Sequence, residues 1–380
     1  MKMKERILTV LKHKHPDRIP WVPSADYWYA VNKRNDTLPK EFEGCDQCDI
    51  MKSVGVGLWG RVYEAVYREE RPNIKVKRRK QERDIYTIYE TPIGSLSTRD
   101  RISIAVRDEV LPYAFGDEIF PIKYMIEDVD DLRIARYMIE DTIYHVDYEK
   151  FFEQEKRFAE DGLVIAAVPR CALQRILVEF MGFEKGIMAL HDHPKEVEDL
   201  MAVIEQKNNE AYQIAAESPA KAIWSPENID GTVTSPSLYK KYCLPSFNKR
   251  GEILHKHNKV SMIHIDGNLH SLLPLIRDTD IDVVEGVTPL PFGDVEINEV
   301  KAIWNDKVII WGGIPASIMA YGIIDEEFEQ YVINLLRKIT PGDNFVLAMG
   351  DLIPPDAVFE RIKIVSDVVE KYGKYPIKID

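Results

Sequence analysis

Residues 235–268 read SPSLYKKYCLPSFNKRGEILHKHNKVSMIHIDGN. A hydroxyl residue, Ser235, precedes Pro236, which is typical of a helix start, and the amphipathic stretch that follows predicts a helix over Ser237–His257. The apolar run Val260–Ile265 comes next and ends in polar and turn residues. This order of helix, buried strand and turn is one unit of an alternating pattern, and it indicates a parallel α/β fold.

The same alternation recurs over most of the chain. Eight apolar runs predict strands: Ile19–Pro23, Gly55–Trp59, Leu163–Val168, Ala220–Trp224, Val260–Ile265, Ile281–Val287, Val308–Trp311 and Asn344–Met349. Further stretches have helical periodicity: Lys4–Lys12, Glu41–Lys52, Glu196–Ala216, His270–Arg277, Glu296–Trp304 and Glu326–Ile339. Eight parallel strands, each followed by a helix, predict a closed (α/β)8 TIM barrel with its active site at the carboxyl ends of the strands. An open doubly wound sheet is the alternative, although no glycine-rich dinucleotide turn follows any of these strands.

One region interrupts this alternation. Residues of about 63–116 alternate charged and β-prone side chains and contain the turn sequence Thr91-Pro92-Ile93-Gly94, which predicts an inserted β-hairpin region. We therefore expect one barrel domain over residues 1–380 that carries this insertion. The basic run Lys75–Lys80 lies within it. A solvated strand edge protected by charge is the simpler interpretation of this run, and contact with an anionic substrate or an acidic partner is the other.

The composition is that of a globular protein, with 45% hydrophobic and 30% charged residues. Fifty Lys and Arg against 63 Asp and Glu give a formal net charge of −13, which argues against binding to nucleic acid. The first residues lack the apolar core of a signal peptide and no uncharged run is long enough to cross a bilayer, so we expect neither secretion nor membrane insertion. Four cysteines are too few for a disulfide framework, which favours a reducing cytoplasm.

Polar side chains gather at the predicted carboxyl ends of the strands. Because alternate residues of a strand share a face, we expect His264 and Asp266 to point toward the barrel axis and its mouth. Other strand ends bring further polar residues to the same edge: Glu227, Asn228, Asp230, Glu285 and Asp351. For Asp230, a turn with a helix cap is an equally good interpretation. The acids cannot all stay charged and unpaired in a partly buried mouth, so either a divalent cation neutralises them or some are protonated and act as general acids.

Two other motifs are weaker. Cys45 and Cys48 form a lone Cys-x-x-Cys pattern, which gives little support to a zinc or redox role without a second pair. Trp21 lies in the first predicted strand and Tyr27 and Trp28 follow it, and either core packing or an aromatic pocket would explain these three residues.

Several segments resemble the uroporphyrinogen decarboxylase superfamily. They are Arg6–Leu8, Lys14–Pro20, His264–Asn268, Trp311–Ile314 and Leu347–Pro355. The resemblance covers nearly the whole chain and implies an (α/β)8 barrel with one of two chemistries, porphyrinogen decarboxylation or cobalamin-linked methyl transfer. The decarboxylases carry an arginine-rich motif after the first strand and an Asp near the end of the next, and neither is present in Trp21–Trp28 or Gly57–Gly60. An acidic mouth would also repel a polycarboxylate substrate.

The methyltransferase branch of this superfamily includes enzymes that move a methyl group between a corrinoid protein and a thiol, with zinc held by a His-x-Cys pair and a later Cys. The positions that resemble these ligands are His264, Asp266 and Asp351, so oxygen ligands replace both sulfur ligands. The resemblance therefore implies a corrinoid-dependent methyltransferase that takes a methyl group from a small donor. An aromatic methyl ether or a methylamine would be such a donor, and a corrinoid protein would be the acceptor.

On this resemblance, His264, Asp266, Asp351 and Glu227 are expected as zinc ligands or proton donors. Glu227, Asn228, Asp266 and Glu285 are the expected catalytic residues, of which Asn228 and Glu285 would position the substrate. Cobalamin would arrive on a partner protein, because 380 residues leave no length for a cobalamin-binding domain beside the barrel. A homodimer is compatible with this expectation. Uroporphyrinogen-type decarboxylation is the alternative function, and a barrel that kept the fold without the chemistry is the second alternative.

Overall fold

The computed structural model describes residues 1–62, 65–102, 119–320 and 322–379. The chain divides into two compact units: the first contains residues 1–66, 148–167 and 216–380, and the second contains residues 67–147 and 168–215. The predicted insertion of about 63–116 includes residues 63–64 and 103–116, which lie outside the described residues. One barrel domain that carries this insertion therefore stays a prediction.

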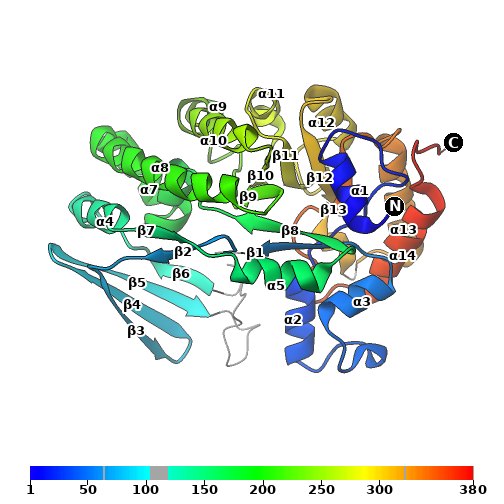
Figure 1. Ribbon diagram of the computed structural model, residues 1–380, viewed down its shortest axis with the longest axis horizontal. Coiled ribbons are helices and arrows are strands. Elements are labelled where there is room, and N and C mark those ends of the chain that lie inside the picture. Colours follow the sequence, from blue (N-terminus) through cyan, green and yellow to red (C-terminus); the bar gives the residue numbers. More distant parts are fainter. Residues whose placement is uncertain (63–64, 103–118, 321, 380) are drawn as a thin grey trace. The chain divides into compact units, whose positions relative to one another are not determined.

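Seven parallel strands form the sheet of the first unit (Figure 1). In their order across the sheet they are β1 (Leu58–Val62), β8 (Gly162–Ala167), β9 (Ala222–Ser225), β10 (Val260–His264), β11 (Val283–Val287), β12 (Ile309–Ile314) and β13 (Phe345–Met349). The register places His264 of β10 opposite Glu285 of β11, and Glu285 opposite Trp311 of β12. The carboxyl ends of these strands therefore lie along one edge, as predicted.

The extended segment of residues 21–24 forms backbone contacts at both outer strands of this sheet, β13 and β1. Trp21 and Ser24 form parallel bridges with Leu347 and Leu352, in and just after β13. The carbonyl of Trp21 also accepts a hydrogen bond of 2.9 Å from the N–H of Gly57, just before β1. This segment was predicted as the first strand, and it forms isolated bridges instead of a regular strand. Together with the curled parallel sheet it gives a TIM-barrel-like α/β fold.

Alternate residues of the strands build the core between them. The side chains that share this inner position are buried together: Val22, Trp59, Leu163, Ile165, Ala167, Ala222, Trp224, Met262, Val283, Ile309, Trp311, Val346 and Ala348. Parallel strands are covered on both faces, which is why their sequences are almost wholly apolar. Further along three of the strands, the next inner positions carry Arg61, His264 and Glu285. The core therefore ends in a polar layer at the carboxyl edge of the sheet.

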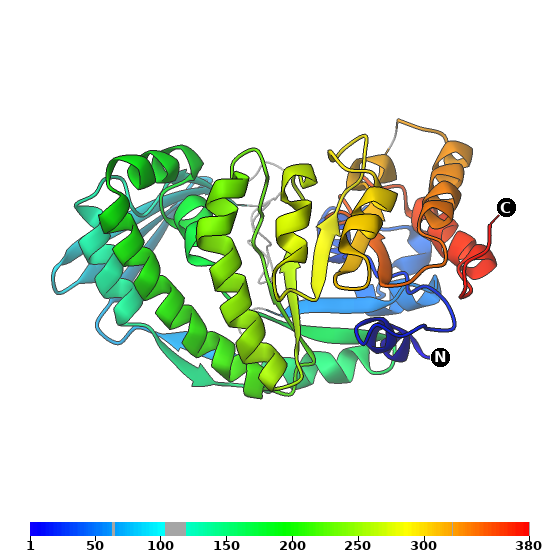
Figure 2. The same ribbon diagram turned by 90° about the horizontal axis from the view of Figure 1, so that it is seen from above.

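Helices cover the outer side of the strands (Figures 1 and 2). In the first unit they are α1 (Met3–Val10), α2 (Asp26–Arg34), α3 (Gln47–Ser53), α5 (Glu149–Phe158), α9 (Pro236–Leu238), α10 (Leu244–Lys256), α11 (Leu273–Arg277), α12 (Ile297–Trp304), α13 (Asp325–Lys338) and α14 (Phe359–Tyr372). Short segments of 3-10 helix lie at Lys40–Phe42, His270–Leu272 and Ala316–Met319. Figure 2 shows α11, α12 and α13, coloured from yellow to orange, next to one another, and they contact each other in this order. Across the described residues, no helix combines the length and the apolar composition that a bilayer crossing requires.

Most predicted elements of the first unit are confirmed, with shifts at their ends. The predicted helix Ser237–His257 consists of α9, a π-helical segment Tyr239–Cys243 and α10. Helix α2 was not predicted, and it explains one of the aromatic residues after the first strand. Trp28 of α2 stacks on Phe359 of α14 with ring centroids 5.3 Å apart, so core packing accounts for this tryptophan.

The second unit contains two antiparallel sheets. Strand β2 (Tyr67–Glu70) pairs with β7 (Ile143–Val146). The other sheet has the order β3 (Lys75–Gln81), β4 (Asp84–Thr91), β5 (Gly94–Ile102) and β6 (Ile119–Lys123). The helices are α4 (Asp131–Glu140), α6 (Ala172–Gln174), α7 (Phe183–Asp192) and α8 (Pro194–Glu217), with a π-helical segment at Arg175–Phe180. Every residue of the basic edge strand β3 is exposed, which agrees with the interpretation of a solvated edge protected by charge.

Candidate metal centre

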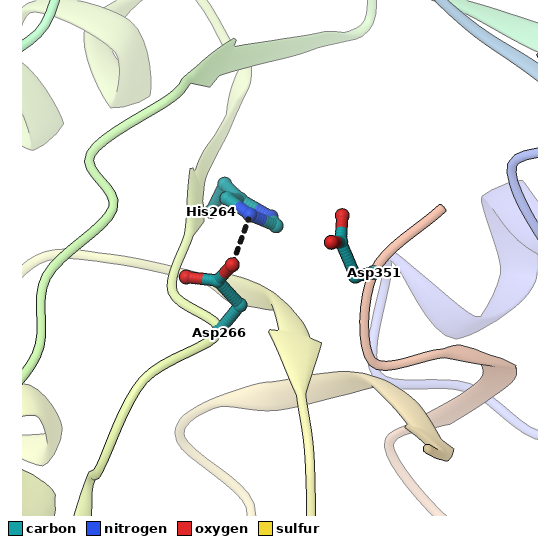
Figure 3. A group of neighbouring side chains, drawn as sticks. All are labelled: His264, Asp266 and Asp351. Carbon is teal, nitrogen blue, oxygen red and sulfur yellow. Dashed lines mark ion pairs between the residues drawn. The ribbon is translucent and has the colours of Figure 1, made fainter. Parts of the chain in front are cut away.

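Three side chains with metal-binding groups meet at the carboxyl ends of β10 and β13 (Figure 3). His264 is the last residue of β10, Asp266 follows it by two residues, and Asp351 follows the end of β13 by two residues. One ligating atom of each side chain lies within 4.8 Å of those of the other two. Figure 3 shows the carboxylates of Asp266 and Asp351 on two different sides of the imidazole. The fold thus brings together three of the four predicted metal ligands.

Two carboxylates hold the imidazole of His264. Its Nδ1 lies 2.7 Å from Oε2 of Glu285, and its Nε2 lies 3.6 Å from Oδ2 of Asp266. Glu285 also accepts a hydrogen bond of 3.2 Å from the indole N–H of Trp224. His264 and Glu285 are 5% and 2% exposed, so water has little access to their contact. Glu285 therefore orients the ring, and Nε2 is the nitrogen directed toward Asp266.

A glycine beside the ring makes this contact possible. Gly286 has a φ of +98°, a backbone conformation that side chains rarely tolerate. A Cβ atom at this position would lie 2.9 Å from both Nδ1 and Cε1 of His264. The sequence Glu285-Gly286 therefore supplies both the acceptor for the imidazole and the space that the imidazole occupies.

The neighbouring carboxylates control the protonation of His264. Burial by itself lowers the pKa of an imidazole, but Glu285 and Asp266 outweigh this effect and raise the pKa of His264 to about 10. Burial raises the pKa of Asp266, but the hydrogen bond and charge of His264 outweigh it and hold that pKa below its usual range. A cation that binds Nε2 therefore has to displace a proton, which makes its affinity dependent on pH.

The donor set fits a divalent cation such as zinc. One imidazole nitrogen and two carboxylate oxygens are ligands that zinc accepts in three-ligand sites. Ligand atoms of a tetrahedral zinc site lie about 3.3 Å apart, and Nε2 of His264 lies 3.6 Å from Oδ2 of Asp266. Asp351 has to approach by about 1.5 Å at most to reach the same spacing. Glu285 occupies the place of the outer carboxylate that commonly orients a ligating histidine.

Glu227, the fourth predicted ligand, lies in a different arrangement. Its carboxylate accepts hydrogen bonds from Nη1 of Arg250 and from Oγ of Ser225, both at 2.7 Å. Glu227 is 0% exposed and Arg250 is 2% exposed, so the two form an ion pair within the core. Among the described residues, the group that could hold a metal contains His264, Asp266 and Asp351 and does not include Glu227.

The loop after β9 contacts the loop after β10 through its backbone and one carboxylate. The N–H of Asn228 donates a hydrogen bond of 3.1 Å to the carbonyl of His264. Asp230 accepts hydrogen bonds from the N–H of Thr232 at 2.7 Å and from the N–H of Asn268 at 2.9 Å. These contacts agree with the interpretation of Asp230 as a turn residue. Asn228 lies against the candidate site through its main chain.

Sequence reasoning missed Arg61 of β1. Its guanidinium lies 5.0 Å from the ring centroid of Trp59 and 5.1 Å from that of Trp224. Its Nη2 donates a hydrogen bond of 3.1 Å to Oγ of Ser24. The sequence does contain a signal for this residue. Arg61 follows the apolar Trp59 by two residues at a strand end, and alternate residues of a strand share one face, so Arg61 lies on the inner face.

Comparisons with known proteins show a family and a solved structure with a similar fold. The family model described as uroporphyrinogen decarboxylase (URO-D) matches residues 175–372, slightly more than half of the chain. No curated protein matches the sequence. Among solved structures, a methyltransferase from Methanosarcina mazei has a TM-score of 0.60 at 11% identity, and the match covers 98% of this chain and 99% of that chain. At this identity the similarity concerns the fold alone.

Two further solved structures are less similar. A D-psicose 3-epimerase from Clostridium cellulolyticum H10 has a TM-score of 0.36 at 8% identity, with 64% of this chain and 85% of that chain covered. A sugar phosphate isomerase/epimerase from Parabacteroides distasonis has a TM-score of 0.32 at 10% identity, with 93% of this chain and 96% of that chain covered. TM-scores this low indicate neither a shared fold nor a shared function.

Proposed function

The chain belongs to the uroporphyrinogen decarboxylase family, and on this premise we propose that it is a corrinoid-dependent methyltransferase. It takes a methyl group from a small donor, an aromatic methyl ether or a methylamine, and passes it to a corrinoid carried by a separate protein. The observation that supports this proposal most is the group of His264, Asp266 and Asp351 at the strand ends. These ligands suit a cation that activates a leaving group.

An unactivated bond between methyl carbon and oxygen breaks only when the departing oxygen is stabilised. In such a transfer, the methyl carbon would accept an electron pair from the corrinoid, and the electron pair of the broken carbon–oxygen bond would stay on the oxygen of the donor. A bound divalent cation would stabilise that oxygen as a Lewis acid. The same requirement applies to the departing nitrogen of a methylamine.

In this step, the chain's own residues would hold the metal-binding side chains in position for the cation. Glu285 binds Nδ1 of His264 and so leaves Nε2 for the cation, and Trp224 in turn holds Glu285. The two carboxylates of Asp266 and Asp351 balance the charge of a divalent ion. Because Glu285 is buried behind the imidazole, we assign it to orienting His264. Asn228, next to the carbonyl of His264, remains the residue that we propose to position the donor.

Decarboxylation of a porphyrinogen is the second candidate, and the match to the family model favours it. Such a substrate carries several carboxylates. Asp266 and Asp351 are negative groups at the edge where it would bind, and they would repel it unless both are neutralised. We prefer methyl transfer for this reason.

The test combines both candidate reactions. Purified protein is incubated with a corrinoid carrier protein, reduced cobalamin and a panel of aromatic methyl ethers and methylamines, and the demethylated donor is measured by chromatography. We expect methyl transfer that falls at least about 100-fold in Asp351→Asn, since this variant removes a cation ligand. Circular dichroism checks that the variant is folded. Uroporphyrinogen is offered in parallel, and release of carbon dioxide without methyl transfer from any donor would overturn the proposal.

A further inference from the structure

Strands β3, β4, β5 and β6 of the second unit lie side by side (Figure 1), and one face of their sheet is rich in basic side chains. Residues that pair directly across antiparallel strands share a face. The register therefore places six basic side chains on one face: Lys75, Lys77, Arg79, Arg99, Arg101 and Lys123. On the other face Thr87 and Leu96 are buried, and helix α4 contacts β4 and β5. The basic face is therefore the outer face of the sheet.

Protection of a strand edge does not explain this distribution. Basic side chains on an edge strand discourage pairing with other chains, which accounts for those of β3. Arg99 and Arg101 lie on β5, which pairs with β4 on one side and β6 on the other and so has no free edge. The cations of β5 therefore need another explanation, and so does the fact that they share a face with those of β3.

Acidic neighbours neutralise only part of this charge. Asp84 accepts hydrogen bonds from Nε of Arg99 at 2.7 Å and from Nε of Arg101 at 2.8 Å, so one carboxylate serves two guanidinium groups. Two lysines are balanced one to one, in the pairs Lys77 with Glu90 and Lys123 with Glu127. Within the part of the chain that the structure describes, Lys75 and Arg79 form no ion pair. The face thus has an excess of positive charge, although the whole chain has a formal net charge of −13.

A row of side chains crosses all four strands on this face. Tyr86 of β4 lies between Arg79 of β3 and Arg99 of β5, whose guanidinium carbons are 5.4 and 5.5 Å from the centroid of its ring. Lys123 of β6 pairs opposite Arg99 and completes the row. With about 4.8 Å between neighbouring strands, the row is about 14 Å long, which is more than one phosphate or carboxylate group can cover. The row therefore suits a ligand with several anionic groups.

Apolar side chains on the same face favour a protein as this ligand. Ile88 and Phe120 are 41% and 51% exposed, and they share the face with Tyr86 and the arginines. Aromatic residues and arginine are enriched in protein interfaces. Single-stranded nucleic acid would need an open aromatic ring for its bases to stack on, but two guanidinium groups lie over the ring of Tyr86. A longer polyanion would also meet the acidic remainder of the surface.

We propose that the outer face of β3, β4, β5 and β6 binds an acidic segment of a partner protein. Carboxylates of the partner pair with Lys75 and Arg79, which have no acidic neighbour to displace. Apolar side chains of the partner contact Ile88 and Phe120. This inference does not depend on methyl transfer, because it concerns a different unit of the chain from the candidate metal centre.

The test uses poly-L-glutamate as a defined acidic polypeptide. A fluorescently labelled chain of about 25 residues is titrated with the protein in about 50 mM NaCl, and the anisotropy gives the Kd. We expect binding that weakens as salt is added, since ion pairing releases counterions. The double variant Lys75→Gln with Arg79→Gln should bind about 10-fold more weakly and with a smaller salt dependence, as the loss of two exposed ion pairs predicts.

A matched control separates the face from a general change of charge. Lys195→Gln with Lys221→Gln removes two lysines at exposed positions outside the sheet and should leave the Kd unchanged. Circular dichroism checks that both double variants are folded. No binding of poly-L-glutamate to the wild-type protein, or equal weakening in both double variants, would overturn the proposal.

Other occupants of the face are tested in parallel. A thymidine oligonucleotide with the same number of charges and vesicles of phosphatidylserine are titrated under the same conditions. Tighter binding of either than of poly-L-glutamate would overturn the proposal and assign the face to nucleic acid or to a membrane. Sedimentation of the wild-type protein tests a second copy of the chain: self-association that disappears in Lys75→Gln with Arg79→Gln would also overturn it.

Discussion

Carboxylates contact a basic side chain at the ends of two neighbouring strands, and the two groups differ in how completely the protein encloses them. After β9, Glu227 binds Arg250, and neither side chain is more than 2% exposed. At the end of β10, His264 lies between the buried Glu285 and Asp266, whose side chain is 33% exposed. The first pair is balanced within the core, whereas the second is open on one side. A carboxylate at a strand end is available to bind a ligand only if its partner leaves it partly exposed. Its position in the sequence alone does not decide this.

The largest effect is expected at the enclosed pair. Arg250→Ala should lower the free energy of unfolding by about 3–5 kcal/mol, because it leaves the carboxylate of Glu227 buried without its cation. Urea denaturation followed by circular dichroism measures this change. The double variant Arg250→Met with Glu227→Leu removes both charges and should recover most of the loss. A loss below about 1 kcal/mol in Arg250→Ala would contradict the view that this pair is a structural element of the core.

A substitution in the group of His264, Asp266 and Asp351 should have the opposite effect: it should change metal binding and leave the stability almost unchanged. Asp351→Asn should lower zinc affinity by about 100-fold or more, because it removes a charged ligand, and should change the unfolding free energy by less than about 0.5 kcal/mol. Calorimetric zinc titration and urea denaturation give the two quantities. Asp356→Asn, an exposed neighbour on the same loop, is the matched control. Zinc affinity that is the same in both variants would exclude Asp351 as a ligand.

A smaller effect is expected at Glu285, which touches the imidazole from behind. Glu285→Gln keeps the shape of the side chain but removes its charge, so zinc affinity should fall by about 10- to 100-fold. In the zinc-free protein, the pKa of His264 should fall below its value of about 10, because Glu285 is the main charge that raises it. Zinc titration and NMR titration of the imidazole test these two expectations. An unchanged pKa would show that Asp266 alone controls the ring.

The smallest effect is expected for His255 and Asp282, an exposed pair of a histidine and a carboxylate. Nε2 of His255 lies 2.9 Å from Oδ2 of Asp282, and this hydrogen bond holds the pKa of His255 above its usual 6.5. Because the folded pKa is the higher one, the pair contributes its full stability below about pH 6.5 and loses it as the pH rises through the folded value. Solvent screening limits the contribution to below about 1 kcal/mol.

Urea unfolding of the wild-type protein and His255→Gln between about pH 5.5 and 9 measures this contribution. The difference in stability between the two proteins should be largest at the acidic end and should shrink as the pH rises. A difference that grows with pH would show that the pair acts in the opposite sense.

The alternation of strands and helices could be predicted because parallel strands are buried on both faces. The run Val308–Trp311, for example, is wholly apolar and became the first part of β12 (Ile309–Ile314). The segment Ile19–Pro23 was predicted to be extended, but its pairing by isolated bridges depends on Leu347 and Gly57, which lie far away in the sequence. Such pairing leaves no periodic signal in the segment itself.

The candidate site could be predicted in part for a related reason. His264 lies near the end of an apolar run, Asp266 and Asp351 follow such runs, and parallel strands bring their carboxyl ends to one edge. Glu227 follows the same rule, but its partner Arg250 comes from helix α10, and no strand pattern indicates which helix residue turns inward. Arg61 was missed because attention to acids and histidines at strand ends leaves out a basic residue in the same position.

Asp230 connects the loop after β9 to the loop after β10. Its carboxylate binds the N–H of Thr232 and of Asn268, and the N–H of Gly231 adds a bond of 2.8 Å to the carbonyl of Asn268. Gly267 allows this contact, since a Cβ there would lie 2.7 Å from Cβ of Asp230. Because Asp266 precedes Gly267, these bonds also connect the backbone next to a candidate cation ligand to the loop after β9. The position of Asp266 beside His264 is thereby fixed by residues of two loops and not by its own loop alone.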